Sequence, residues 1–172
     1  CIFHLAAENI PSVCEKKPIE SFTTNIKGTF TITQLGFINK VKKIVFTSSA
    51  FVYSQPPLYL PIDEKHPISK SQSFYGSMKL LAESICLDQR IKYPSTSIAI
   101  ARLFNVYGPG QTDYYVIPKL IKQCLNNKID TIDLWEGEST RDFMYIEDVL
   151  EGLILLANKS GSVGPINLGS GE

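Results

Sequence analysis

The chain has 172 residues, of which 44% are hydrophobic and 20% charged, a composition typical of a folded domain with one sizeable core. Seventeen basic residues balance seventeen acidic ones, so charge gives no reason to expect binding to nucleic acid or to an anionic membrane. The apolar runs are too short for a membrane span. The four cysteines are widely spaced, with no Cys-x-x-Cys pair and no His cluster, which argues against a metal site and favours a reducing compartment, the cytoplasm.

Strand-length apolar runs alternate with helix-length amphipathic segments in the first part of the chain. Strands are expected over residues 1–7, 44–48 and 97–104, and helices over residues 19–37 and 73–91. Strands separated by helices of this length predict right-handed βαβ crossovers and a parallel sheet covered on both faces. The fold class is therefore α/β, with part of a Rossmann-like, doubly wound parallel sheet. The proline-rich stretch 51–72 is expected to be a loop, and loops of this length are usually functional.

The second part of the chain has shorter elements. We expect helices over residues 118–126 and 148–157, and short strands over residues 131–135, 141–146 and 165–168. Pro118 is compatible with a helix only in the first turn, and the acidic start of 148–157 suits the positive end of a helix.

One segment carries residues suited to proton transfer. Tyr75-Gly76-Ser77-Met78-Lys79 places a phenol and an ammonium four residues apart, on one face of the expected helix. A free tyrosine has a pKa of about 10, and a nearby fixed cation favours the phenolate and lowers that pKa. A tyrosine tuned in this way can take a proton from a sugar hydroxyl while hydride leaves the same carbon. Ser49 follows the strand 44–48 at its carboxyl end, where open α/β sheets bind ligands, and its hydroxyl can hold the substrate oxygen.

The spacing by itself is weak evidence in a chain with eight tyrosines and many lysines. Tyr115 and Lys119 have the same spacing, but Pro118 forces the helix to begin after Tyr115, so these two side chains need not share a face. Ser49, taken alone, is equally well explained as a serine that ends a strand. Its position relative to Tyr75 and Lys79 favours the catalytic interpretation.

Blocks of residues along nearly the whole chain resemble extended short-chain dehydrogenases/reductases, and among these the NAD-dependent epimerase/dehydratase family. In the order of the family, the blocks are His4-Leu5-Ala6-Ala7, Asn25-Ile26-Lys27-Gly28-Thr29, Phe46-Thr47-Ser48-Ser49-Ala50-Phe51-Val52-Tyr53, Tyr75 with Lys79, Arg102-Leu103-Phe104-Asn105-Val106-Tyr107-Gly108-Pro109, Arg141 to Val149, and Ile166-Asn167-Leu168-Gly169-Ser170-Gly171.

The resemblance implies a role for each matching residue. The catalytic residues would be Tyr75 as acid/base, Lys79 as its electrostatic and ribose-binding partner, and Ser49 as the group that orients the substrate hydroxyl. The dinucleotide would also contact Leu5, Ala6, Ala7, Asn25, Thr47 and Val106, and the nucleotide diphosphate would be held by Asn105 and Arg141, because a guanidinium matches phosphate geometry. Without the blocks, plainer interpretations would be preferred: a polar residue inside a helix for Asn25, a turn residue for Asn105 and a surface ion-pair partner for Arg141.

The resemblance also implies a domain division and a missing segment. Residues 1–107 would form the C-terminal part of a dinucleotide-binding domain, and residues 108–172 mainly a smaller α/β substrate-binding domain, with segments returning to the main sheet. The resemblance implies NAD as cofactor. NADP is not excluded, because the glycine-rich phosphate loop of the family and the acidic residue on its next strand do not occur in this sequence. Because the chain opens without Met, inside a strand-like run, we expect a fragment that also lacks the C-terminal end and is inactive alone.

The expected function is that of a nucleotide-sugar epimerase similar to UDP-hexose 4-epimerases, with a nucleotide-diphosphate sugar as substrate and transient oxidation at C4. Dehydration is disfavoured, because the family's dehydratases carry an acid pair where this chain has Ala50 and Phe51. Two alternatives stay open: an NAD(P)H-dependent nucleotide-ketosugar reductase, and a non-catalytic dinucleotide-binding fragment. The resemblance further implies a homodimer for the full-length protein.

Overall fold

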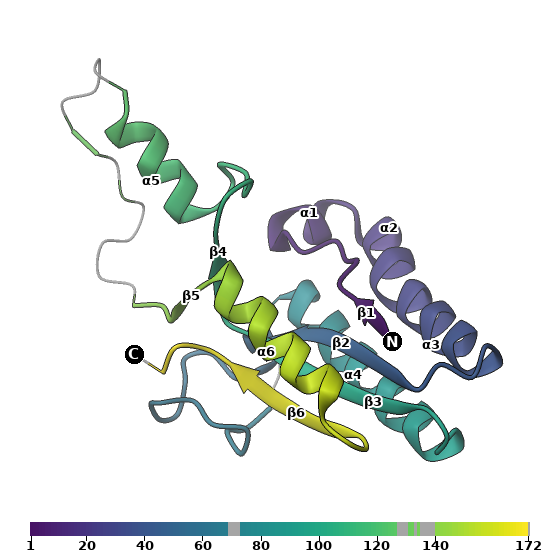
Figure 1. Cartoon of the computed structure of the whole chain (residues 1–172). Helices are drawn as coiled ribbons and strands as arrows, with labels where there is room; N and C mark the ends of the chain where they lie inside the picture. The colour runs from purple at the N-terminus through teal and green to yellow at the C-terminus, as the bar shows by residue number, and fades with distance from the viewer. Residues whose placement is uncertain (69–72, 127–130, 133, 135–139, 172) are drawn as a thin grey trace.

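The computed structural model describes residues 1–68, 73–126, 131, 132, 134 and 140–171. Its main sheet has four parallel strands in the order β1 (Ile2–His4), β2 (Lys43–Ser49), β3 (Ser97–Leu103) and β6 (Val163–Leu168). β4 (Asn105–Tyr107) and β5 (Phe143–Tyr145) pair as a second, two-stranded parallel sheet (Figure 1). The prediction of a parallel α/β sheet is confirmed.

Six α-helices connect and cover the strands in the described part of the chain. They are α1 (Pro11–Lys16), α2 (Pro18–Phe22), α3 (Gly28–Ile38), α4 (Phe74–Lys92), α5 (Val116–Cys124) and α6 (Ile146–Asn158). A π-helical turn, η1 (Thr23–Lys27), joins α2 to α3, and a 3₁₀ turn, η2 (Ala50–Val52), follows β2. None of the described helices combines the length and apolarity that a membrane span requires.

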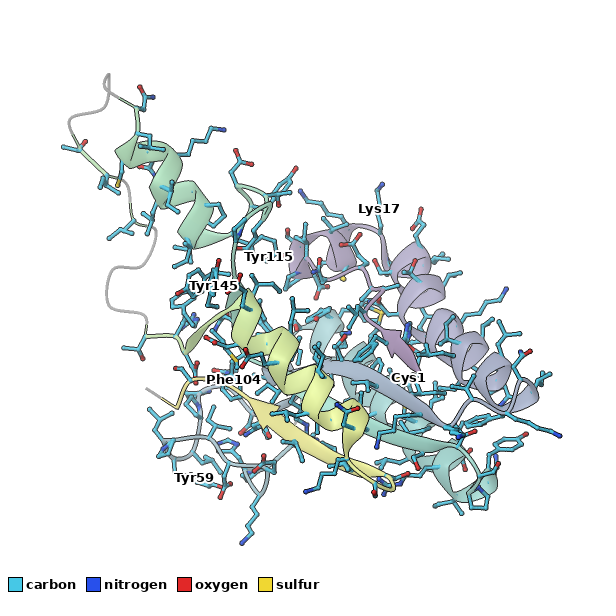
Figure 2. All side chains as sticks on the ribbon, viewed as in Figure 1. Cys1, Lys17, Tyr59, Phe104, Tyr115 and Tyr145 are labelled. Carbon is cyan, nitrogen blue, oxygen red and sulfur yellow. The ribbon has the colours of Figure 1, made fainter. Side chains whose placement is uncertain are left out.

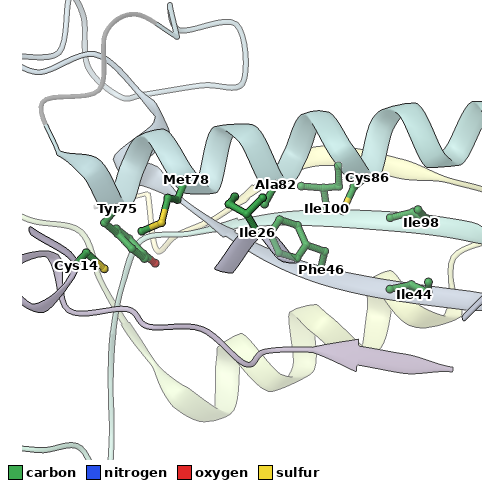
Figure 3. Packing of buried hydrophobic residues seen from close by; sticks show 10 residues of the cluster. All are labelled: Cys14, Ile26, Ile44, Phe46, Tyr75, Met78, Ala82, Cys86, Ile98 and Ile100. Atoms are coloured by element: carbon green, nitrogen blue, oxygen red, sulfur yellow. The ribbon is translucent and has the colours of Figure 1, made fainter. Parts of the chain in front are cut away.

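Two apolar clusters fill the spaces on either side of the main sheet. One lies between the sheet and α4 and contains Phe46, Met78, Ala82 and Ile100, together with Cys14 of α1 and Ile26 of η1 (Figure 3). The other lies under α6, which packs Val149, Leu153 and Leu156 against the opposite face (Figure 1). Because both faces are covered, all seven residues of β2 are buried, as continuous apolar strands predict.

The amino end of β2 is tied to the second half of the chain by a buried lysine. The Lys43 ammonium donates hydrogen bonds to the backbone carbonyls of Lys159 (2.8 Å) and Gly161 (2.6 Å), where α6 ends. Burial lowers the pKa of Lys43. The link holds α6 and the start of β6 on the sheet.

Several element boundaries differ from the prediction for identifiable reasons. β1 ends at His4 instead of residue 7, and Leu5 is 49% exposed. The helix expected over 19–37 exists as α2, η1 and α3, while α1 was not predicted because six residues are too few for a clear periodicity. α5 begins at Val116, with Pro118 in its first turn as expected. Of the strand expected over 131–135, residues 133 and 135 lie outside the described residues, and residues 131, 132 and 134 are not in a strand.

The division of the chain at residues 107 and 108 stays a prediction. α5, β4 and β5 lie away from the main sheet, while α6 and β6 return to it (Figure 1).

Candidate active site

The first turn of α4 is held in place by two side chains that accept hydrogen bonds from its free backbone N–H groups. Ser73, the N-cap, accepts through Oγ from the N–H of Gly76 (3.1 Å). Glu15 of α1 accepts through Oε1 from the N–H of Phe74 (2.8 Å). These two contacts fix the turn that carries Tyr75, at the carboxyl ends of the parallel strands.

Tyr75 is buried at this end of the sheet, and the Ser49 hydroxyl is near enough to its phenol to influence its pKa. In Figure 3, Tyr75 lies at one end of the apolar cluster, next to Cys14. The Phe51 ring meets the Tyr75 ring edge-on, with 5.7 Å between centroids. Burial raises the pKa of Tyr75 to about 12, and the Ser49 hydroxyl offsets only part of that rise.

The expectation of a lowered Tyr75 pKa is therefore wrong for this structure. The physical reason is desolvation, because burial penalises the phenolate more than the Ser49 hydroxyl favours it. The Lys79 ammonium lies 5.8 Å from the centroid of the Tyr75 ring, over its face.

Lys79 follows Tyr75 by one helical turn and is 5% exposed. Its Nζ donates to the backbone carbonyl of Thr47 (2.8 Å) and lies 5.2 Å from the centroid of the Phe46 ring. Burial lowers the pKa of Lys79 to about 8. Among the described residues the Thr47 carbonyl is the one hydrogen-bond acceptor of this ammonium, which leaves two N–H groups for a ligand.

The structure thus brings together the three residues that the sequence singled out as catalytic. The Ser49 hydroxyl is close enough to the Tyr75 phenol to lower the pKa of Tyr75, and Lys79 lies on the same helix face as Tyr75. By contrast, Tyr115 is the N-cap of α5 and precedes the helix that contains Lys119, as Pro118 predicts.

The residues expected around a dinucleotide lie at the same end of the sheet. Leu5 and Ala6 are exposed and Ala7 is half-buried, immediately after β1. Asn25, in η1, holds this segment: its Nδ2 donates to the carbonyl of Glu8 (2.9 Å), and its Oδ1 accepts from the N–H of Glu8 (2.8 Å). Asn25 is therefore already engaged with backbone, and it orders the chain that follows Leu5–Ala7.

The remaining expected site residues divide into two groups. Thr47 is buried in β2, its Oγ1 donating to the carbonyl of His4 (3.3 Å), and Val106 is half-buried in β4. Asn105 donates through Nδ2 to the carbonyl of Asp142 (3.1 Å). Arg141 is exposed and donates through Nη1 to the carbonyl of Thr140 (2.8 Å), so within the described residues its guanidinium is not brought to the triad.

Sequence reasoning missed three neighbours of the site. Glu15 supports the first turn of α4, Phe51 covers one edge of Tyr75, and the Tyr115 phenol is close enough to raise the pKa of Tyr75 further. Tyr115 lies where α5 begins (Figure 2). Only Phe51 had a usable signal, its position two residues after Ser49, because the other two reach the site from distant segments.

The chain is similar to known proteins along nearly its whole length. The family model described as the NAD dependent epimerase/dehydratase family matches residues 1–169. UDP-glucuronic acid decarboxylase 3 of Arabidopsis thaliana is 33% identical over 177 residues, covering 98% of this chain and 50% of that protein. UDP-glucose 4-epimerase of Yersinia enterocolitica is 29% identical over 188 residues, covering 99% of this chain and 55% of that protein.

A solved structure shares the fold. The structure of MoeE5 in complex with UDP-glucose and NAD superimposes with a TM-score of 0.86 at 28% identity, covering 99% of this chain and 56% of that one. The chain spans about half the length of the curated relatives that it matches. With a family model that matches almost every residue, the chain belongs to the NAD-dependent epimerase/dehydratase family.

Proposed function

We propose that the whole protein is an NAD-dependent nucleotide-sugar epimerase that inverts C4 of a UDP-hexose through transient oxidation. The observation that carries this proposal is the convergence of Ser49, Tyr75 and Lys79 at the carboxyl ends of the parallel strands. The similarity to a UDP-glucose 4-epimerase supports the substrate class.

The residues at this end of the sheet fit a dinucleotide. Leu5 and Ala6 present an exposed apolar surface after β1, and the Lys79 ammonium has two N–H groups available for ribose hydroxyls. Leu5–Ala7, Lys79, Thr47 and Val106 would hold the cofactor. When bound, NAD would supply a hydride acceptor, and the NAD found with MoeE5 supports NAD as the cofactor, while the NADPH found with RMD from Pseudomonas aeruginosa leaves NADP open.

The chain's own residues would move the proton. The Ser49 hydroxyl would hold the C4 oxygen beside the phenol, and Tyr75 would receive the C4 proton and later return it. Burial opposes the phenolate, so Tyr75 needs a compensating positive charge when it acts as base. Lys79, on the same helix face, is the cation available for this.

Oxidation at C4 is compatible with more than one outcome. A C5 carboxylate lies β to a C4 ketone, so a UDP-glucuronic acid oxidised there can lose CO₂ to leave an enolate, which then takes up a proton at C5. The 33% identical relative named as such a decarboxylase favours this as the second candidate. Dehydration requires an acid to protonate the departing hydroxyl, and Ala50 and Phe51 follow Ser49 instead of carboxylic acids. Reduction of a nucleotide-linked ketosugar by NAD(P)H would use the same triad in reverse.

The experiment is to incubate the whole protein with NAD and UDP-glucose, and in parallel with NAD and UDP-glucuronic acid, and to analyse the products by chromatography and mass spectrometry. The expected product is the C4 epimer of UDP-glucose, at unchanged mass. Loss of CO₂ from UDP-glucuronic acid with no epimerisation would replace the first candidate by the second. A dehydrated 4-keto-6-deoxy sugar would overturn the reasoning from Ala50 and Phe51.

We also propose that the whole protein is a cytoplasmic homodimer. Large apolar side chains on α2 and α3 are exposed, including Ile19 (79%) and Ile38 (72%), and a second copy would cover such a surface. Four free cysteines support a reducing compartment. Light scattering that reports the mass of a monomer at micromolar concentration would exclude the dimer.

A further inference from the structure

A buried arginine lies close to the proposed catalytic residues without belonging to them. Arg102 is the sixth residue of β3 and is 3% exposed. Its Nε and Nη2 donate to the two carboxylate oxygens of Glu83, at 2.9 Å and 2.7 Å. Its Nη1 donates to the Tyr53 hydroxyl (3.0 Å), and the guanidinium carbon lies 4.9 Å from the centroid of the Tyr53 ring. We call Arg102, Glu83 and Tyr53 the Arg102 bracket.

One arm of the Arg102 bracket reaches the helix that carries the base. Glu83 follows Lys79 by four residues and Tyr75 by eight, so all three lie along one face of α4. A bidentate pair between a guanidinium and a carboxylate restricts orientation as well as distance. The Arg102–Glu83 pair therefore restricts the rotation of α4 about its axis relative to β3.

The other arm reaches the segment that carries the orienting hydroxyl. Tyr53 follows Ser49 by four residues, directly after the 3₁₀ turn η2. Its hydroxyl accepts from Arg102 and donates to Oδ1 of Asn167 in β6 (2.5 Å). The end of β2 and the face of α4 are thus both attached to the same guanidinium.

We propose that Arg102 is a positioning residue that, through Glu83 and Tyr53, sets the Ser49 hydroxyl against the Tyr75 phenol. The desolvation of two charges makes a buried ion pair a poor source of stability, so stability alone does not account for it. The directional hydrogen bonds of Arg102 to Glu83 and Tyr53, one on each catalytic segment, do account for it. The consequence for turnover rests on the proposed function, whereas the geometric consequence does not.

The first test measures geometry without any reaction. Every tyrosine of the whole protein, including the eight in this chain, is replaced by 3-fluorotyrosine. The fluorine resonance of Tyr75 is assigned by its loss in Tyr75→Phe. Tyr53→Phe removes only the hydroxyl of one bracket arm and keeps the Arg102–Glu83 pair. Tyr59→Phe is the matched control, because the Tyr59 hydroxyl lies in the same loop but bonds to the exposed Asp63 (2.7 Å).

The expected result is that Tyr53→Phe shifts the Tyr75 resonance in the same direction as Ser49→Ala, that the double variant shifts it no further, and that Tyr59→Phe leaves it unchanged. The proposal would be overturned if Tyr53→Phe left the Tyr75 resonance unchanged. It would also be overturned if the shifts caused by Tyr53→Phe and Ser49→Ala were additive in the double variant. Arg102→Lys keeps the positive charge but loses the bidentate hydrogen bonding of the guanidinium, and is expected to shift the Tyr75 resonance more than Tyr53→Phe does. If this variant does not fold, the result with Tyr53→Phe still tests the proposal.

The second test uses turnover of the UDP-hexose. Tyr53→Phe is expected to lower kcat by about tenfold, with KM changed less than about twofold, since a 1 Å misplacement in a catalytic site can cost about a hundredfold in rate. In the Ser49→Ala background the same substitution should have no further effect on kcat. Equal losses in both backgrounds would refute the bracket. An inactive parent protein would instead refute the proposed function, and the fluorine resonances would still decide the bracket.

Discussion

Replacing Lys79 by methionine should separate two consequences of its buried ammonium, its cost to the stability of the fold and its contribution to catalysis. Methionine has similar length and no charge, so it removes the cost of holding a cation in an apolar site. The pKa of Lys79 is lowered from 10.5 to about 8 by burial. A shift of this size corresponds to about 3 kcal/mol against the folded state, at about 1.4 kcal/mol for each unit. The hydrogen bond to the Thr47 carbonyl is lost, at a cost of about 1 kcal/mol.

The net expectation at pH 7 is a variant about 2 kcal/mol more stable than the parent protein and without catalytic activity. At this pH Lys79 is protonated in both folded and unfolded chains, so the parent carries the full penalty. As pH rises from about 8 to 10.5, the folded chain releases its proton while the unfolded chain keeps it, and the parent gains stability. The advantage of Lys79→Met should therefore shrink through this interval and be absent above it.

The assay is urea denaturation of both proteins, without added dinucleotide, at a series of pH values from 7 to 10.5. Comparing the two proteins at each pH cancels the other groups that titrate in this range. A variant that is less stable at pH 7, or a stability difference that does not change with pH, would refute the reasoning from the buried charge.

Two further substitutions test the site and the sheet. Tyr75→Phe should lower turnover by at least about a hundredfold, because the group that carries the proton is lost. Dinucleotide affinity, measured by calorimetry, should stay within about threefold of that of the parent protein. Near-normal turnover would show that another residue is the base. Gly164→Ala should destabilise the fold by more than about 2 kcal/mol in thermal unfolding, since Gly164 has φ +87° and an added Cβ would lie 2.4 Å from the Ile100 carbonyl oxygen. Gly161→Ala, at φ +70° with nothing within 4 Å, is its control and should cost no more than about 2 kcal/mol.

The elements that sequence predicted best are those with long, regular patterns. The helix around Tyr75 was bounded almost correctly because Ser73 is a good N-cap and apolar residues recur at helical spacing through α4. β1 was predicted too long because Leu5 and its neighbours are apolar yet largely exposed. Sequence alone does not distinguish apolar residues of a strand from apolar residues that line a binding surface.

The electrostatics of the site could not be predicted from spacing. The Tyr75–Lys79 interval indicates a shared helix face, but the pKa of Tyr75 depends on how deeply the ring is buried. That burial comes from segments far apart in sequence, such as Cys14 in α1 and Phe51 in η2. The pairing of Arg102 with Glu83 was likewise hidden, because the two residues lie in different elements that meet only in the folded chain.

The lysine at the amino end of β2 suggests how such a fold can diversify. Lys43 attaches the end of α6 to the sheet through two backbone carbonyls, and a backbone carbonyl is present whichever residue occupies the position. This fastening lies at the end of β2 opposite to Ser49. Substitutions around the reacting sugar can therefore accumulate without loosening the scaffold, and substrate preference is free to evolve at one end of the strands while the other end keeps the chain folded.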